Sequence, residues 1–245
     1  MNLLEVQGLR KTYPVFRLED VSFSVPEGAV MGLIGRNGAG KSTTLKSILG
    51  LVHPDAGRVE MFGREFSENE RYIKENIGVV LGGIDFYPKK KVRTITDVTR
   101  RFYSNWQEEK YRHYLDLFAI DENKRVDQLS SGMRVKYLLA LALSHNARLL
   151  ILDEPTSGLD PVSRDELTEL LRRIAADGTR SVLFSTHITS DLEKCASHIT
   201  FIQEGRLQRS DTLAGFMAHY ADLGSTLEEI IVAAERRPYD ADAII

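Results

Sequence analysis

One glycine-rich segment constrains the fold of this chain more than any other. Directly after the short apolar run 30–34, the chain reads Gly35-Arg36-Asn37-Gly38-Ala39-Gly40-Lys41-Ser42-Thr43, and a helical pattern follows to about residue 49. Glycines in such a loop let the backbone turn tightly, and N–H groups then point inward at the mouth of a helix whose dipole favours negative charge. The pattern predicts a strand–loop–helix unit that cradles phosphate, and therefore an α/β fold.

The polar side chains of the loop suit the outer phosphates of a nucleotide. Lys41 supplies a full positive charge, and Ser42 offers a hydroxyl ligand to Mg²⁺, which prefers oxygen ligands. From average residue usage, such a match arises by chance in about one in a hundred chains of this length. The alternative is a glycine-rich turn without a ligand. We interpret the loop as a nucleoside triphosphate site contacted by Gly35, Asn37, Gly38, Ala39, Gly40, Lys41, Ser42 and Thr43.

Two adjacent carboxylates end an apolar strand later in the chain. The run 149–152 has the continuous apolar character of a strand buried on both faces, and Asp153 and Glu154 follow it. Such a strand delivers the acids to the carboxyl edge of a sheet, where ligands bind. Since side chains alternate along a strand, we expect Asp153 to hold Mg²⁺ and Glu154 to accept a proton from water attacking the γ-phosphate. The alternative is a strand end capped by two solvated acids.

Composition excludes several classes of protein. The 245 residues carry 32 basic and 35 acidic side chains, a formal charge of −3, which argues against a nucleic-acid partner held by a large basic face. The longest apolar stretch, Tyr137–Leu143, falls far short of the about 20 residues that cross a bilayer. The N-terminal segment is unlike a secretory signal, so we expect a cytoplasmic chain. One cysteine and six histidines without metal-ligand spacing make structural zinc improbable.

Strand patterns alternate with helical ones along most of the chain. Residues 1–30 predict strand, turn and strand, whereas residues 85–146 are helical and aromatic: Phe102 lies four residues after Val98, and Tyr111, Leu115 and Phe118 repeat at helical spacing. We interpret these aromatic residues as core, with a groove for another protein's helix as the alternative. Near the C-terminal end, Ser225 and Glu228 have the spacing of a capping box. The expected single domain has a core of about 1–84 and 147–210, a helical subdomain of about 85–146 and a helical tail of about 211–245.

The motifs together resemble the ATP-binding subunit of an ATP-binding cassette (ABC) transporter over about residues 3–210. The specific mark is Leu129-Ser130-Ser131-Gly132-Met133 ahead of a helix, which is similar to the LSGGQ signature of that family. By itself the pentapeptide is a common helix-capping turn, and its position before the strand with the acids makes it specific. The resemblance implies a P-loop NTPase (RecA-like) core with an antiparallel β subdomain and an inserted α-helical subdomain.

The resemblance also implies that two ATP-binding subunits, identical or different, pair head to tail. Ser130, Ser131 and Gly132 of one subunit would close over the nucleotide held by the phosphate loop of the other. Asp160 lies in a segment, 157–160, that resembles the loop through which the subunits sense each other's sites. ATP would then hold the pair together, and hydrolysis would release it.

Two further residues match the family by order and spacing. Tyr13 resembles the aromatic residue that stacks on adenine, where an ordinary strand tyrosine is the alternative. His187, at the end of a buried strand, resembles the histidine that contacts the γ-phosphate and orients Glu154; a purely structural histidine is the alternative. The resemblance thus assigns catalysis to Lys41, Glu154 and His187, with ATP and Mg²⁺ bound.

One position departs from the family. In the segment 77–88, the place of a glutamine that usually coordinates Mg²⁺ is taken by Gly82. Glycine has no side chain to coordinate a metal. We therefore expect water in that coordination place and looser coupling between the metal and the helical subdomain.

No stretch of this chain can span a membrane, so the transport path would belong to a separate integral-membrane permease. That permease would dock against residues 85–106 and hold the chain at the inner face of the cell membrane. Export is slightly favoured over import. A soluble ABC ATPase acting on chromosomes or ribosomes is disfavoured because neither long coiled coils nor a second cassette is present. A P-loop kinase would lack the signature, and the cargo is not encoded in these motifs.

Overall fold

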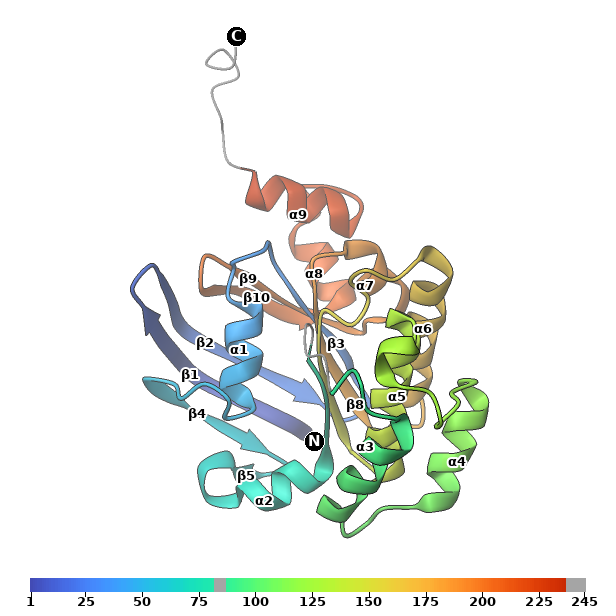
Figure 1. Ribbon diagram of the computed structural model, residues 1–245. Helices are drawn as coiled ribbons and strands as arrows, with labels where there is room; N and C mark the ends of the chain where they lie inside the picture. The colour runs from blue at the N-terminus through green and yellow to red at the C-terminus, as the bar shows by residue number, and fades with distance from the viewer. Residues whose placement is uncertain (82–86, 237–245) are drawn as a thin grey trace.

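The computed structural model of the chain describes residues 1–81 and 87–236, and the strands within these ranges form one sheet (Figure 1). Its order is β5-β4-β1-β2-β10-β9-β3-β8-β7-β6. The strands are β1 (Asn2–Tyr13), β2 (Phe16–Pro26), β3 (Val30–Ile34), β4 (Ala56–Met61), β5 (Arg64–Glu65), β6 (Ile77–Val80), β7 (Leu149–Asp153), β8 (Ser181–Thr186), β9 (His198–Gln203) and β10 (Arg206–Thr212).

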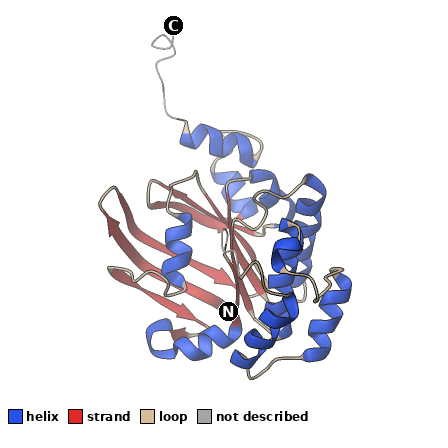
Figure 2. Ribbon diagram, viewed as in Figure 1, coloured by secondary structure: helices blue, strands red, loops and turns tan. Residues whose placement is uncertain are grey.

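Helices cover both faces of this sheet, as Figure 2 shows. Helix α1 packs on one face, and α5 to α9 contribute to the apolar cluster on the other. The helices are α1 (Lys41–Ile48), α2 (Phe66–Asn76), α3 (Val92–Thr99), α4 (Glu108–Leu117), α5 (Ser131–Ser144), α6 (Pro161–Ala175), α7 (Thr189–Cys195), α8 (Leu213–His219) and α9 (Leu227–Glu235). Within the described ranges, no helix has the length and apolar character needed to cross a bilayer.

The centre of the sheet is parallel, and this arrangement positions the site. Strand β3 pairs in parallel with β8 and β9, β8 pairs with β7, and β7 pairs with β6. The carboxyl ends of β3, β7 and β8 therefore meet at one edge of the sheet. Strand β7 is buried along its length: Leu149 and Ile151 join the cluster around α1, whereas Leu150 and Leu152 join the opposite cluster. The prediction that this strand is buried on both faces is confirmed.

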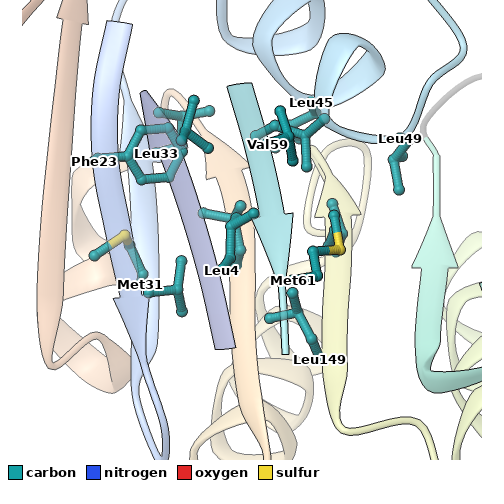
Figure 3. Packing of buried hydrophobic residues seen from close by; sticks show 14 of the residues in the cluster. Leu4, Phe23, Met31, Leu33, Leu45, Leu49, Val59, Met61 and Leu149 are labelled. Atoms are coloured by element: carbon teal, nitrogen blue, oxygen red, sulfur yellow. The ribbon is translucent and has the colours of Figure 1, made fainter. Parts of the chain in front are cut away.

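The predicted strand, turn and strand at the N-terminal end are also confirmed. Strand β1 pairs antiparallel with β2 on one side and with β4 on the other. This antiparallel part packs against α1 in one apolar cluster, where Figure 3 shows Leu45 of α1 beside Val59 of β4. The phosphate loop and the antiparallel strands thus share one core.

The segment between β6 and β7 carries a smaller cluster of its own, built from α3, α4 and α5. Tyr111, Leu115 and Phe118 are buried there, as the core interpretation predicted. Two apolar residues of α3 and the turn that follows are exposed instead: Val98 at 53% and Phe102 at 71%. The core interpretation is therefore wrong for Phe102, which lies at the surface although it continues the helical spacing from Val98.

The capping box near the C-terminal end lies one residue later than the sequence predicted. Thr226, not Ser225, is the N-cap of α9, and Glu229 is its partner. Both pairs have the required spacing. The structure buries Leu227 and Ile230 completely, and a helix that begins at Leu227 places them on one inward face. The cap is identified by its hydrogen bond, because the N–H of Glu229 donates to Oγ1 of Thr226 at 3.2 Å.

Candidate nucleotide-binding site

The glycine-rich loop joins β3 to α1, as its pattern predicted. Gly40 is the N-cap of α1 with φ +113°, a conformation that L side chains rarely adopt. At Gly35, a Cβ atom would lie 2.1 Å from the carbonyl oxygen of Ile202 in β9, so only glycine allows this close approach. The loop is thereby pressed against the sheet while its free N–H groups gather at the start of α1.

Lys41 is the buried cation of the loop, with 5% of its surface exposed. Its Nζ donates to the carbonyl oxygens of Gly35 (2.7 Å) and Arg36 (3.2 Å) and lies 3.4 Å from Oε1 of Glu154. These contacts fold the side chain back along the loop. The ammonium group therefore stands inside the loop, next to the first acid after β7.

The two carboxylates at the end of β7, Asp153 within the strand and Glu154 just after it, diverge, as the alternation of side chains predicted. Asp153 is 7% exposed, and its Oδ1 accepts from the hydroxyls of Ser42 (3.1 Å) and Ser185 (2.6 Å). Glu154 has φ +50°, an uncommon backbone conformation for a residue other than glycine. Its N–H donates to Oγ of Ser185 at 2.9 Å. Ser185 thus contacts the carboxylate of Asp153 and the backbone of Glu154.

His187 follows β8 and completes the group. Its Nδ1 lies 2.8 Å from Oε2 of Glu154, while Oε1 of the same carboxylate faces Lys41. The three residues proposed for catalysis therefore form one chain from the ammonium group through the carboxylate to the imidazole. Their elements are α1, the turn after β7 and the turn after β8, which meet at the same edge of the sheet.

A cleft of about 600 Å³ opens over this group. That volume is within the range of small-molecule sites. The phosphate loop supplies much of the lining, but two of its predicted contact residues, Gly35 and Ala39, are buried and not among the lining residues. The lining residues are Val15, Phe16, Arg36, Asn37, Gly38, Gly40, Lys41, Ser42, Thr43, Glu154, Ser157 and His187.

Tyr13 stands beside this cleft but not in its lining. The residue is 37% exposed, and its ring centroid is 6.5 Å from that of Phe16, which does line the cleft. Val15 and Phe16 are thus the apolar surface nearest to the loop. The sequence signal for them was their place two and three residues after Tyr13, in the turn before β2 and at its first residue.

Ser130, Ser131, Gly132 and Asp160 gather elsewhere, at the starts of α5 and α6. Oγ of Ser130 caps α5 by accepting from the N–H of Met133 at 3.2 Å, and Ser131 lies against the 157–160 segment through Gly158 at 3.4 Å. The carboxylate of Asp160 caps α6, and its hydrogen bonds to Ser163 lower its pKa. Neither helix start is part of the described lining of the cleft.

Oxygen atoms suited to Mg²⁺ are present at the loop. Ser42 and Asp153 bring a hydroxyl and a carboxylate to within 3.1 Å of each other, and a cation that retains waters needs no larger protein cage. Residues 1–81 and 87–236 hold no group of three or more His, Cys, Asp or Glu able to form such a cage. The departure at Gly82 lies outside the described residues.

Sequence reasoning missed Ser185, which is fully buried at the end of β8. Its signal was a hydroxyl directly after the apolar run 182–184, two residues before His187. Because Asp153 of β7 pairs with Ser185 of β8 in the sheet, the hydroxyl of Ser185 lies within hydrogen-bond distance of the Asp153 carboxylate.

A phosphate loop between a parallel strand and a helix, with a carboxylate at the end of a nearby parallel strand, defines a P-loop nucleotide-binding protein. The model of the family described as ABC transporter matches residues 18–157. The chain belongs to the ABC transporter family and is an ATPase of its ATP-binding class.

Individual relatives agree with this assignment. The chain is 32% identical over 208 residues to the bacitracin transport ATP-binding protein BcrA of Bacillus licheniformis, covering 84% of this chain and 68% of that one. It is 39% identical over 191 residues to a Nod factor export ATP-binding protein I of Burkholderia orbicola, covering 76% and 62%. A solved ATP-binding subunit of an ABC transporter superposes with a TM-score of 0.84 at 28% identity, covering 96% of this chain and 100% of that one. The chain thus spans about two thirds of the length of the two named relatives.

Proposed function

We propose that the chain binds ATP with Mg²⁺ in the cleft over the phosphate loop and hydrolyses it to power transport through a separate permease. The observation that carries this proposal is the convergence of Lys41, Glu154 and His187 at one end of the loop. Nζ of Lys41 lies 3.4 Å from Oε1 of Glu154, and Nδ1 of His187 lies 2.8 Å from Oε2. ATP phosphates would replace the carboxylate as the partner of Lys41. That exchange leaves Glu154 beside the γ-phosphate.

In the proposed reaction, Glu154 accepts a proton from the water that attacks the γ-phosphate. The bond between the γ-phosphorus and the bridging oxygen breaks, and ADP leaves with that oxygen. His187 holds the carboxylate through the 2.8 Å contact with Oε2, so that the opposite oxygen can face the water. N–H groups at the start of α1 and the ammonium of Lys41 stabilise the developing negative charge.

Mg²⁺ would be held by Ser42 and Asp153, with water in its remaining positions. When bound, it neutralises charge on the outer phosphates. Tyr13 is proposed to contact the adenine, with Val15 and Phe16 as the apolar surface next to it.

Substitution of Glu154 by glutamine tests the catalytic part. ATP binding should persist, whereas hydrolysis should slow by about a hundredfold or more, since a positioned general base contributes about that much. Glu68→Gln, on the exposed side of α2, is the matched control and should keep the wild-type rate. Undiminished turnover in Glu154→Gln would remove this carboxylate from the mechanism.

We further propose that two subunits pair head to tail. Support comes from the start of α5, which carries anion-binding donors at Ser130 and Gly132 yet stands outside the cleft of its own chain, as does the start of α6. A second subunit would bring them to the ATP, and Asp160 to the shared boundary. ATPase rate per subunit should therefore rise with protein concentration; a constant rate down to nanomolar protein would contradict pairing.

A permease is proposed to dock on the helical side of the chain. An apolar groove of about 580 Å³ lies between α3, α5 and β6, and the exposed Val98 and Phe102 contribute to its lining. Residues 85 and 86 of the predicted docking range, 85–106, lie outside the described residues. The relative named for Nod factor export favours export, and the proposed docking would hold the chain at the inner face of the membrane. Co-purification of an integral-membrane protein, lost in Phe102→Asp and kept in the exposed-site control Val232→Asp, tests this arrangement.

A further inference from the structure

Helix α9 contacts both α7 and the phosphate loop, although it lies outside the lining of the cleft. At its beginning, the N–H of Leu227 donates to Oε1 of Glu193 in α7, the helix that follows His187, at 2.8 Å. Leu227 and Ile230 are fully buried, so α9 is anchored to the domain. Its other end reaches the phosphate loop; Figure 1 shows α9 at the same end of the molecule as the loop before α1.

The last residue of α9, Glu235, makes the contact with the loop. Its Oε1 accepts from the backbone N–H of Arg36 at 3.0 Å, and Oε2 lies 3.6 Å from Nε of the same residue. Only 7% of Glu235 is exposed. The helix end is fixed by Gln203 of β9, whose Nε2 donates to the carbonyl oxygen of Ala234 at 3.1 Å.

Burial of a carboxylate is costly unless the contacts it makes compensate. Burial raises the pKa of Glu235, and the hydrogen bond from the Arg36 N–H acts in the opposite direction. Oε2 has no hydrogen-bond partner among the described residues. The contact that compensates the burial of this carboxylate is therefore its hydrogen bond from the Arg36 N–H in the phosphate loop.

That N–H belongs to the same peptide unit as the carbonyl that holds Lys41. The unit between Gly35 and Arg36 presents its C=O to Nζ of Lys41 at 2.7 Å and its N–H to Glu235 at 3.0 Å. Because a peptide unit is planar, the direction of its N–H fixes the direction of its C=O. Glu235 is therefore mechanically connected to the ammonium group through one rigid plane.

We propose that Glu235 is a positioning residue for nucleotide binding, which orients the Gly35–Arg36 peptide plane and through it Lys41. The inference rests on the proposed binding of ATP at this loop. Without Glu235 the plane can rotate, and Lys41 loses its preorganised position. Affinity for the nucleotide should fall, whereas chemistry on bound ATP should change little.

The test uses the full chain with two nearly isosteric replacements. Glu235→Met keeps the bulk but has no acceptor for the Arg36 N–H, and Glu235→Gln keeps a carbonyl oxygen at that place. Glu228→Met, on the exposed face of the same helix, is the matched control. The Kd for a fluorescent ATP analogue, and KM and kcat for ATP hydrolysis, are measured for each, with melting temperature as a check on folding.

Glu235→Met should raise both the Kd and KM about tenfold, which corresponds to about 1.4 kcal/mol, with kcat within about twofold of wild type. Glu235→Gln should stay within about threefold of the wild-type Kd. Wild-type affinity in Glu235→Met, an equal loss in Glu228→Met, or no rescue by Glu235→Gln would each overturn the inference. A wild-type chain that binds no ATP, or a Lys41→Ala variant that binds it normally, would instead overturn the proposed function.

Discussion

Replacement of Ser185 by alanine should damage both stability and turnover, because this buried hydroxyl orients both acids. Its Oγ donates to Oδ1 of Asp153 at 2.6 Å and accepts from the N–H of Glu154 at 2.9 Å. A hydrogen bond to a charged group contributes about 1.5–3 kcal/mol. The N–H of Glu154 keeps a second acceptor, the carbonyl oxygen of Ser185 at 3.2 Å. The expected loss of unfolding free energy is therefore about 2 kcal/mol, dominated by Asp153.

Loss of orientation should cost more in catalysis than in folding. Displacement of a reacting group by about 1 Å can cost about a hundredfold in rate, so we expect kcat to fall about 10- to 100-fold and the Mg²⁺ requirement to rise. Urea unfolding should show a midpoint lowered by about 0.7 M if m is about 3 kcal/mol/M. ATPase assays across Mg²⁺ concentrations give the second measurement.

Ser181→Ala is the matched control for this experiment. Ser181 is also fully buried in β8, but at its opposite end, where Oγ donates to the carbonyl oxygen of Pro26 at 2.8 Å. That variant should lose about 1 kcal/mol of stability and keep wild-type turnover and Mg²⁺ dependence. Normal kcat in Ser185→Ala, or an equal fall in Ser181→Ala, would refute the assignment of Ser185 to the orientation of the acids.

Further expectations concern His145, the β9–β10 turn and Gly82. Burial lowers the pKa of His145 to about 4, so the unfolded chain binds more protons than the native one below about pH 6.5. The free energy of unfolding should therefore fall by up to about 3 kcal/mol between pH 6.5 and pH 4. In urea titrations at pH 5 and 7.5, His145→Phe should remove this pH dependence, whereas the exposed control His113→Phe should keep it. Gly205→Ala would place a Cβ 1.8 Å from the Arg17 carbonyl oxygen, so it should lower the melting temperature far more than Gly63→Ala, at which nothing lies within 4 Å. Gly82→Gln should tighten the Mg²⁺ dependence of hydrolysis, and an unchanged dependence would make that position irrelevant.

The sequence predicted those parts of the site that local pattern determines. Val30–Ile34 followed by the glycine-rich loop predicted β3 and α1, and two acids after an apolar run predicted the edge at which Asp153 lies. The chain order of strands does not state which of them are neighbours, but strands that are parallel and buried on both faces must end at a common edge. Local chemistry and this one rule were enough to bring the loop and both acids together.

Contacts that depend on distant pairing could not be predicted in this way. Ser185 reaches Asp153 only because β8 and β7 pair in a register that no local pattern encodes. Glu235 is 199 positions from Arg36 in the chain, and its helix shows only an amphipathic face and a capping box. Even the capping residue was misplaced by one position, because two overlapping pairs satisfy the same spacing.

Helix α1 links ligand binding to the free energy of unfolding of the whole domain. Its first residue, Lys41, belongs to the nucleotide cleft, while Leu45 and Ile48, one and two turns later, are fully buried among the antiparallel strands and β7. A ligand that binds the first turn of α1 therefore stabilises the whole sheet. It raises the free energy of unfolding by about 2.7 kcal/mol when its concentration is a hundred times Kd. Heating curves recorded against increasing ATP should consequently report occupancy of the site without any label on the nucleotide.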